Sequence, residues 1–270
     1  MSVLLPTRSV EKVWGLDTLP APFVAPDGKR IGEIWFEPPA ELPELLVKYI
    51  FASEKLSIQT HPDDAQTEAM GIGRQGKEEC WLILDAEPGA TIAAGFRKEV
   101  DAATMRAAAL DGSIEDMLVW HEVQPGDFFY IPANTVHAIG GGVSLLEVQQ
   151  NSDITYRLYD YGRPRELHLE EGMAVAKGEP HPASCRAKFG ADFSGRLVDG
   201  PHFLLDRIVG EPEAGALDGY DGKLLVLPVA GKVRVAGNSV GAGECALAAS
   251  TADIAFDAGA TLFITQPIHS

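Results

Sequence analysis

The sequence predicts a mostly β protein made of two barrel or sandwich units, with a helical insert in the first unit. Short apolar or alternating segments, bounded by Gly, Pro, Asn and Asp, recur through most of the 270 residues, which is the pattern of strands. Many short strands at close spacing are typical of sandwiches and barrels. A chain of this length can hold one large or two small domains, each with a substantial core.

We expect the first unit to span residues 1–165. Its predicted strands are 31–36, 45–52, 56–61, 80–85, 127–132 and 143–150. A short helix is expected at 63–70, because His-Pro precedes it and Gly71 follows it. Residues 98–119 are rich in Ala, Leu and Met and have Asp101 as an N-cap, so we interpret them as the helical insert.

The second unit is expected within residues 166–270, after a connecting segment that has a brief helical pattern near 169–176. Its predicted strands are 203–209, 223–231, 232–237, 244–249, 254–258 and 261–266. The only conceivable metal ligands in its half-barrel segment are Glu244 and Cys245. Neighbours on a strand point to opposite faces, so we expect a metal-free β unit from about residue 197.

Composition favours a soluble, cytoplasmic protein. Apolar residues make up 46% and charged residues 23% of the chain, a balance typical of globular proteins. No run of about 18 apolar residues indicates a membrane span. The opening MSVLLPTRSVEKVWG has charges and a proline where a signal peptide needs an apolar core. Three scattered cysteines without a CxxC pair fit a reducing compartment.

The net charge of −17 argues against nucleic-acid binding, which needs clustered Lys and Arg. A phosphorylated ligand would be repelled at long range, so a small local cluster of basic side chains would have to hold it.

Polar side chains on three predicted strands are candidates for a metal site. Gln59 and His61 share one face of their strand, so an amide oxygen and an imidazole can converge. Glu78 and Glu79 enter an apolar strand, and alternation places Glu79 on the face of Trp81, although both carboxylates could also precede the strand in solvent. His137 follows a turn and would lie at the mouth of a barrel. A single histidine after a strand and before a proline, as His61 is, is more often an ordinary turn or surface residue.

A fourth stretch, 145–163, interleaves long polar side chains with apolar ones. Glu147, Gln149, Asp153 and Arg157 would line a cavity or face solvent. The combined Gln, His, Glu and His set supplies two nitrogens and two oxygens, which suits zinc without excluding manganese, iron or cobalt. The set contains no thiolate, which favours a catalytic over a structural site.

Four segments, KLSIQTHPDD (55–64), GKEECWL (76–82), GDFFYIPANTVHA (126–138) and EVQQNSDITYRLYDYGR (147–163), resemble successive signatures of the class I phosphomannose isomerases. The match covers roughly the first 165 residues in the right order, and is most similar to the short bacterial form. The resemblance implies a double cupin fold, with a catalytic N-terminal cupin domain and a cupin-like second β domain.

The resemblance further implies a zinc-dependent enzyme of carbohydrate metabolism that interconverts mannose 6-phosphate and fructose 6-phosphate through an enediol. It assigns one zinc ion to four ligands, Gln59, His61, Glu79 and His137. Arg157 corresponds to the catalytic arginine, and Lys77 is a plausible second cation for the substrate. The base stays open between Glu147, Lys77 and a metal-bound hydroxide.

Three alternatives remain at this stage. The ligand set also fits an iron-dependent cupin oxygenase, and a cupin that binds a sugar without turnover is a non-enzymatic possibility. Arg157 could instead form a surface ion pair with Asp153 or Asp160. The chain departs from its relatives at Glu78, where Thr or Pro is common, which adds a negative charge near the site.

Overall fold

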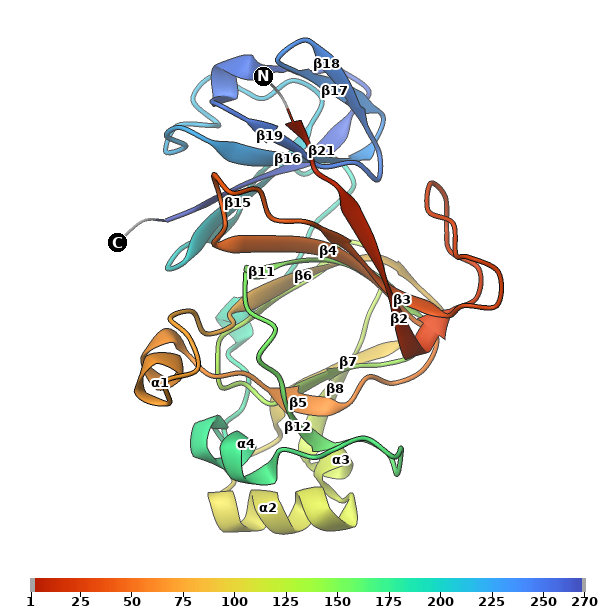
Figure 1. Cartoon of the computed structure of the whole chain (residues 1–270), viewed down its shortest axis with the longest axis vertical. Helices are drawn as coiled ribbons and strands as arrows, with labels where there is room; N and C mark the ends of the chain where they lie inside the picture. The colour runs from red at the N-terminus through yellow and green to blue at the C-terminus, as the bar shows by residue number, and fades with distance from the viewer. Residues whose placement is uncertain (1–2, 269–270) are drawn as a thin grey trace.

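The strands and helices of the protein stack in layers along its long axis (Figure 1). The structure, a computed structural model, describes residues 3–268. The strands are β1 (Val3–Leu4), β2 (Thr7–Leu16), β3 (Ile31–Phe36), β4 (Leu45–Ala52), β5 (Ile58–Thr60), β6 (Glu79–Ala86), β7 (Thr91–Phe96), β8 (Leu118–Glu122), β9 (Asp127–Ile131), β10 (His137–Ile139), β11 (Val143–Gln150), β12 (Tyr156–Tyr159), β13 (Arg186–Lys188), β14 (Gly195–Asp199), β15 (Phe203–Val209), β16 (Leu224–Ala230), β17 (Lys232–Val235), β18 (Asn238–Gly241), β19 (Ala246–Ala248), β20 (Ile254–Ala255) and β21 (Thr261–Pro267). The α-helices are α1 (Asp64–Ala69), α2 (Ala102–Asp111), α3 (Ile114–Met117) and α4 (Leu169–Val175).

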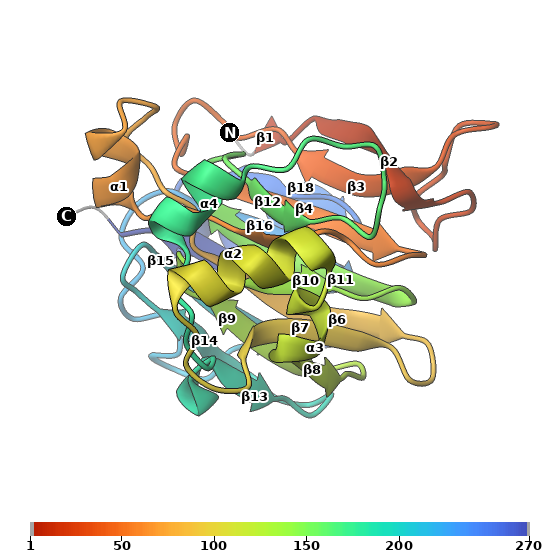
Figure 2. The ribbon, with the colours of Figure 1, turned by 90° about the horizontal axis from the view of Figure 1, so that it is seen from below.

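Two sheets form the barrel of the first unit. A seven-stranded sheet has the order β13-β9-β6-β11-β4-β3-β2, and a five-stranded sheet has the order β12-β5-β10-β7-β8. Trp81, Ile92 and Leu145 belong to the apolar cluster between them. Helices α2 and α4 lie across the outer face of the five-stranded sheet (Figure 2). Met105 of α2 packs there with Phe96 of β7. These layers leave the inner faces of both sheets turned toward one interior.

The second unit stacks on the outer face of the seven-stranded sheet. Its six-stranded sheet has the order β1-β19-β16-β21-β15-β14, and a three-stranded sheet, β18-β17-β20, closes the far side. Phe36 and Phe51 from the first unit share one buried cluster with Leu205 and Phe263 from the second. Because this core is continuous, the second unit supports the sheet that carries Glu79.

Two strands do not follow the simple division of the chain at residue 165. β1, at the start of the chain, pairs with β19 in the six-stranded sheet. β13, which lies in the expected connecting segment, pairs with β9 in the seven-stranded sheet. The domain boundaries therefore stay a prediction, because β1 lies in a sheet of the second unit and β13 lies in a sheet of the first.

Several predicted elements agree with the observed ones in extent, including the strands 31–36, 45–52 and 143–150. The helix expected at 98–119 is wrong at its end. Asp101 caps α2 as predicted, but Gly112 ends that helix with φ of 87°, and α3 is a separate turn. Leu118 already begins β8, so the insert is shorter than its composition indicated.

Within residues 3–268, no helix combines the length and apolarity that crossing a membrane requires.

Candidate functional site

One wall of the interior is the five-stranded sheet, which carries two of the predicted ligands side by side. Gln59 on β5 is the direct partner of His137 on β10, and Arg157 on β12 is the partner of Gln59 on its other side. Directly opposed residues of antiparallel strands project to the same face. Strand pairing thus brings an amide, an imidazole and a guanidinium together from segments nearly 100 residues apart in sequence.

The opposite wall is the seven-stranded sheet, where Glu79 begins β6 and is fully buried. Its neighbour Glu78 turns the other way and accepts a hydrogen bond from the Tyr130 hydroxyl. Alternation predicted that Glu78 and Glu79 point to opposite faces, and the two side chains lie in that way. Further along the sheet, direct pairing aligns a row of side chains, Trp81, Glu147, Lys48, Trp35 and Arg8.

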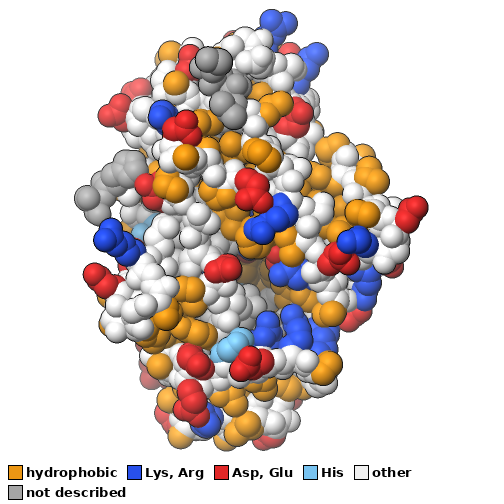
Figure 3. Space-filling model, viewed as in Figure 1, with side chains coloured by type: hydrophobic (Ala, Val, Ile, Leu, Met, Phe, Trp, Pro, Cys, Tyr) orange, Lys and Arg blue, Asp and Glu red, His pale blue; other side chains and the backbone are white. Residues whose placement is uncertain are grey.

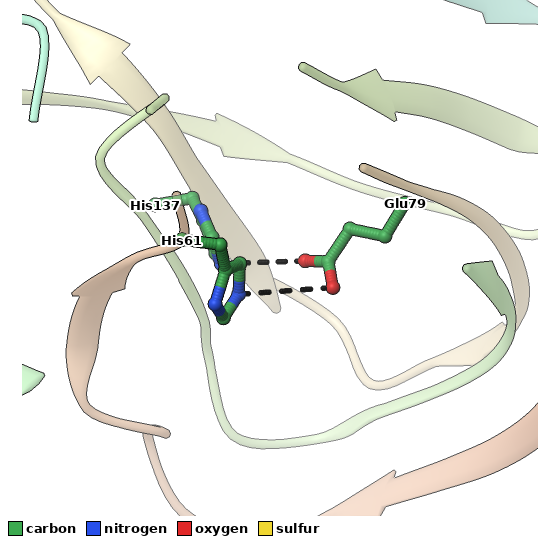
Figure 4. A group of neighbouring side chains, drawn as sticks. All are labelled: His61, Glu79 and His137. Atoms are coloured by element: carbon green, nitrogen blue, oxygen red, sulfur yellow. Dashed lines mark ion pairs between the residues drawn. The ribbon is translucent and has the colours of Figure 1, made fainter. Parts of the chain in front are cut away.

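His61, Glu79 and His137 meet in a buried group whose ligand atoms all lie within 4.8 Å of one another (Figure 4). His137 Nε2 lies 3.3 Å from Glu79 Oε1, and His61 Nε2 lies 3.8 Å from Glu79 Oε2. A tetrahedral ion with bonds near 2.1 Å would separate its ligand atoms by about 3.4 Å. The spacing of the group is therefore that of a small metal site.

Both histidines direct an unprotonated Nε2 toward this group. His61 Nδ1 donates to the carbonyl of Ile154 at 2.8 Å, and His137 Nδ1 donates to the carbonyl of Thr135 at 2.9 Å. A carbonyl only accepts, so the proton of each neutral ring lies on Nδ1 and the lone pair on Nε2. Burial lowers the pKa of His61, with the charge of Lys77 acting in the same direction, and burial lowers the pKa of His137 to about 4. Neutral imidazoles with this backbone support are the usual metal ligands.

Glu79 is buried, and within residues 3–268 its Oε1 has no hydrogen-bond donor. Lys77 Nζ forms an ion pair with Oε2 at 2.7 Å and lies 3.3 Å from His61 Nε2. A buried carboxylate with unused lone pairs is costly unless a cation supplies the missing contacts. The donor set around Glu79 fits a divalent metal on this ground.

Gln59 lies at the edge of the group. Its Nε2 is 3.4 Å from His137 Nε2, while its Oε1 accepts a hydrogen bond from the Ser57 hydroxyl at 3.1 Å. Rotating the amide by half a turn exchanges oxygen and nitrogen, which X-ray structures at ordinary resolution also leave to inference. The rotated amide would direct its oxygen toward the histidines.

Beside this group lies a cavity of about 370 Å³, lined from both sheets by Gln59, Glu79, Lys48, Glu147 and Arg157 among others. Lys and Arg outnumber Asp and Glu among its lining residues, six to four. Figure 3 shows a hollow in this face of the molecule with Lys and Arg side chains gathered at its rim. A chain with a net charge of −17 thus has a locally basic cavity, as binding of an anion would require.

Arg157 lines the cavity with part of its guanidinium unpaired. Its Nη1 donates to the Glu166 carbonyl at 2.7 Å, but its Nε is buried without a partner. Burial and the nearby charge of Arg165 lower the pKa of Arg157. Asp160, which was considered above as an ion-pair partner of Arg157, instead forms ion pairs with Arg163 at 3.3 Å and with Arg165 at 2.6 Å. No ion pair of Arg157 occurs among the described residues 3–268, so the guanidinium is available to an anion in the cavity.

Glu147 also faces the cavity and has two buried partners. Lys48 Nζ lies 2.7 Å from Oε1, and the Trp81 indole donates to Oε2 at 2.8 Å. Burial would lower the pKa of Lys48, but the attraction of Glu147 and Glu33 outweighs it and raises that pKa. Lys48 and Glu147 therefore form a buried ion pair within the row of side chains that runs from Trp81 to Arg8.

The sequence analysis missed Lys48, Trp35 and Arg165 as lining residues. For Lys48 a signal existed. It is the only charged residue of LLVKYIFA, a segment that is buried along its whole length. A lysine in such a strand needs a buried partner, so it marks a polar interior.

The second unit has no comparable group among residues 3–268. Glu244 accepts a hydrogen bond from the Gly241 amide at 2.7 Å, and Cys245 is buried in the apolar core between the units. The metal-free second unit stays a prediction.

No family model matches the chain. The chain is 43% identical over 141 residues to mannose-6-phosphate isomerase ManA of Bacillus subtilis, an alignment that covers 48% of this chain and 43% of that relative. It is 40% identical over 147 residues to the mannose-6-phosphate isomerase of Streptococcus mutans, covering 52% of this chain and 46% of that relative. The similarity in sequence thus spans about half the length of these curated relatives.

The likeness in fold extends over nearly the whole chain. A crystal structure of the mannose 6-phosphate isomerase from Bacillus subtilis superposes with a TM-score of 0.78 at 24% identity, covering 98% of this chain and 99% of that one. A variant of phosphomannose isomerase from Salmonella typhimurium gives 0.68 at 15% identity, covering 99% and 100%. The predicted resemblance is confirmed: the chain is similar in sequence to curated mannose-6-phosphate isomerases and has the cupin fold of solved phosphomannose isomerases.

Proposed function

We propose that this protein is a zinc-dependent aldose–ketose isomerase that interconverts mannose 6-phosphate and fructose 6-phosphate. The observation that carries the proposal is the buried His61, Glu79 and His137 group beside a basic cavity that Arg157 lines. The relatives in sequence, which are themselves named mannose-6-phosphate isomerases, support the choice of substrate.

Gln59, His61, Glu79 and His137 would hold the metal, and zinc suits two imidazole nitrogens with two oxygens. The unprotonated Nε2 atoms of both histidines and the unpartnered Oε1 of Glu79 support this assignment. When bound, the ion would supply Lewis-acid stabilisation of negative charge on a substrate oxygen.

Isomerisation moves the carbonyl between C1 and C2 of the open-chain sugar phosphate. We assign the proton transfer to Glu147, whose carboxylate would take the proton from C2 of the aldose and deliver it to C1. As the C2–H bond breaks, its electron pair forms the C1–C2 double bond and the C1=O pair moves to O1, which takes up a proton. When the O2 proton leaves, a carbonyl forms at C2 and the double-bond pair forms the new C1–H bond with the proton that Glu147 returns. Lys48, at 2.7 Å, would keep the charge of Glu147 balanced while the proton moves.

Arg157 and Lys77 would stabilise the anionic groups of the substrate. The unpaired Nε of Arg157 can donate to an enediolate or phosphate oxygen, and a guanidinium holds such oxygens in a planar fork. Lys77 Nζ, beside Glu79, would donate to a sugar oxygen at the same end of the cavity. Preorganised donors of this kind act where charge develops during the reaction.

The unit spanning residues 1–165 would contain the whole site, and the unit within 166–270 would support it without a metal of its own. The free thiols of Cys80, Cys185 and Cys245 support a reducing, cytoplasmic setting.

The test is an isomerase assay on the purified protein with mannose 6-phosphate, before and after treatment with a chelator. Formation of fructose 6-phosphate, its loss on chelation and its return with zinc are the expected results. Oxygen consumption without isomerisation would instead indicate an oxygenase, and binding of the sugar phosphate without turnover would indicate a sugar-binding protein. Either outcome would contradict the proposal.

A further inference from the structure

The segment from Gly76 to Glu79 touches the candidate metal centre on one side and the second unit on the other. Lys77 and Glu79 face the metal group, while Glu78, between them, points to the opposite side. Gly76 packs so closely that a Cβ there would lie 2.4 Å from the Asp63 carbonyl carbon. Small movements of this segment would therefore displace Glu79 and Lys77 directly.

Glu78 is held by a group of polar side chains on the side away from the cavity. The Tyr130 hydroxyl donates to Oε2, and His202 Nε2 lies 3.6 Å from Oε1. The Glu78 side chain is only 15% exposed, so its charge depends on these partners.

His202 comes from the second unit, in the turn between β14 and β15. Its Nδ1 lies 3.7 Å from Asp64 Oδ2 and 3.3 Å from Gln150 Nε2. Its carbonyl accepts a hydrogen bond from the Ile268 amide at 2.8 Å, which fixes the backbone of the turn. One imidazole of the second unit thus contacts three polar side chains of the first.

The residues that His202 contacts also anchor the backbone of the segment. Asp64 Oδ1 accepts from the Gly76 amide at 2.7 Å and from Gln150 Nε2 at 2.8 Å. Gln150 Oε1 accepts from the Glu78 amide at 2.9 Å. Side chain and backbone of the segment are therefore both tied to the same imidazole.

We propose that the polar bridge, defined as His202, Glu78, Asp64, Gln150 and Tyr130, positions Glu79 and Lys77 for the candidate metal centre. His202 then acts as a positioning residue, through which the second unit contributes to the site of the first. This inference rests on the proposed function only for the identity of the metal. Its structural part, the fixing of the Gly76–Glu79 backbone, does not depend on it.

The test compares the 270-residue protein with the variants His202→Ala and His202→Gln. Asp199→Asn is the matched control, because Asp199 lies three residues away in the same turn region and forms an ion pair with Arg196. Hydrogen exchange of the metal-free protein should accelerate at the Gly76 and Glu78 amides in His202→Ala. Zinc affinity, measured by competition with a chelator, should fall about tenfold, the low end for loss of a group that supports a ligand.

His202→Gln should recover much of both effects, because its amide can still donate to Glu78, and Asp199→Asn should match wild type. Unchanged exchange at Gly76 and Glu78 in His202→Ala would overturn the proposal. So would equal acceleration throughout β15, β16 and β21, which would show a general loss of stability. If wild type binds no zinc, the proposed function fails, while the exchange data still decide whether the polar bridge positions the segment.

Discussion

At the scale of single residues, the candidate centre depends on which side-chain nitrogen and oxygen atoms remain available to a metal. His61 and His137 each direct Nδ1–H to a backbone carbonyl, so both present Nε2 to Glu79. Within residues 3–268, Glu79 Oε1 has no hydrogen-bond donor, while Oε2 forms an ion pair with Lys77 at 2.7 Å. The backbone thus orients the imidazoles, and Oε1 of the carboxylate remains open to a cation.

Glu79→Gln should abolish stoichiometric zinc binding, because the amide keeps the size of the side chain but removes its charge and one oxygen ligand. The measurement is metal content after dialysis against zinc. Glu122→Gln, a change at an exposed carboxylate of β8, is the control and should keep its metal. A Glu79→Gln protein that retains a full complement of zinc would remove Glu79 from the site.

Arg157→Ala should lower turnover of mannose 6-phosphate by about 10²–10³-fold, the scale for losing one preorganised donor to developing charge. Zinc content and folding should barely change, because Arg157 is not a ligand. Arg157→Lys should restore turnover only in part, since an ammonium lacks the planar fork.

The control for this series is Arg106→Ala, which removes an exposed arginine that pairs with Glu170 on the helical face. Steady-state kinetics decide the matter. Near-normal turnover of mannose 6-phosphate by the Arg157→Ala variant would show that Arg157 has only a structural role.

Part of the site could be predicted from strand alternation alone. Alternation placed Glu78 and Glu79 on opposite faces and Gln59 with His61 on one face. The resemblance to the class I phosphomannose isomerases then selected Glu79 as the ligand. Parity could not show that Gln59 pairs with both His137 and Arg157, because register between distant strands depends on tertiary packing. The pairing of Lys48 with Glu147 could not be predicted either, because Glu147 lies on a strand 99 positions further along the chain.

At the scale of elements, helix α1 fixes the chain directly after His61. Asp63 accepts from the Gln66 amide at 2.8 Å, and the Gln66 side chain accepts from the Asp63 amide at 2.9 Å. These two reciprocal bonds form a capping box, which satisfies donors at the start of the helix. The helix predicted at 63–70 agrees with the observed α1, because tertiary contacts did not override this local capping signal.

Asp63→Ala should lower the free energy of unfolding by about 1 kcal/mol, because the cap to the Gln66 amide is lost. Asp63→Asn keeps an acceptor oxygen and should cost much less. Urea denaturation of both variants measures the difference. Equal stability of the Ala and Asn variants would mean that the cap contributes nothing here.

The error in the helical insert has a physical cause. Residues 98–119 have high helix propensity as a block, but Gly112 adopts a left-handed conformation that ends α2. Leu118 then pairs with Phe96 of β7, and this strand pairing outweighs the propensity of the sequence.

At the scale of the whole molecule, the two units share one apolar core rather than a linker. Phe51 and Phe263 lie in the same buried cluster, and β1 and β13 join sheets far from their neighbours in sequence. Composition could predict two β units, but it could not predict strand exchange between them. Composition likewise could not predict a basic cavity in an acidic chain, because folding brings together six Lys and Arg side chains that are distant in sequence.

The contact of His202 with the first unit should make stability depend on pH. The interaction with the Glu78 carboxylate, opposed by burial and aided by Asp64, raises the pKa of His202 above its ordinary value of 6.5. A raised folded pKa means stabilisation that is fully present below the unfolded pKa and is lost as pH rises through the folded one. The stability gap between wild type and His202→Gln should therefore be larger near about pH 5.5 than at about pH 9.

Denaturation curves at the two pH values measure this gap, with Asp199→Asn as the control that should show no such trend. A gap that grows with pH would contradict a favourable contact between protonated His202 and Glu78.

The most direct test of the central claim is a zinc titration of the chelated protein, followed by turnover of mannose 6-phosphate to fructose 6-phosphate. Turnover should be absent without metal, rise in proportion to added zinc and reach a plateau at about one equivalent per chain, as a single four-ligand site requires. The same titration of Glu79→Gln should stay flat. Full isomerase activity in the chelated wild-type protein, or no activity at any zinc level, would contradict the account.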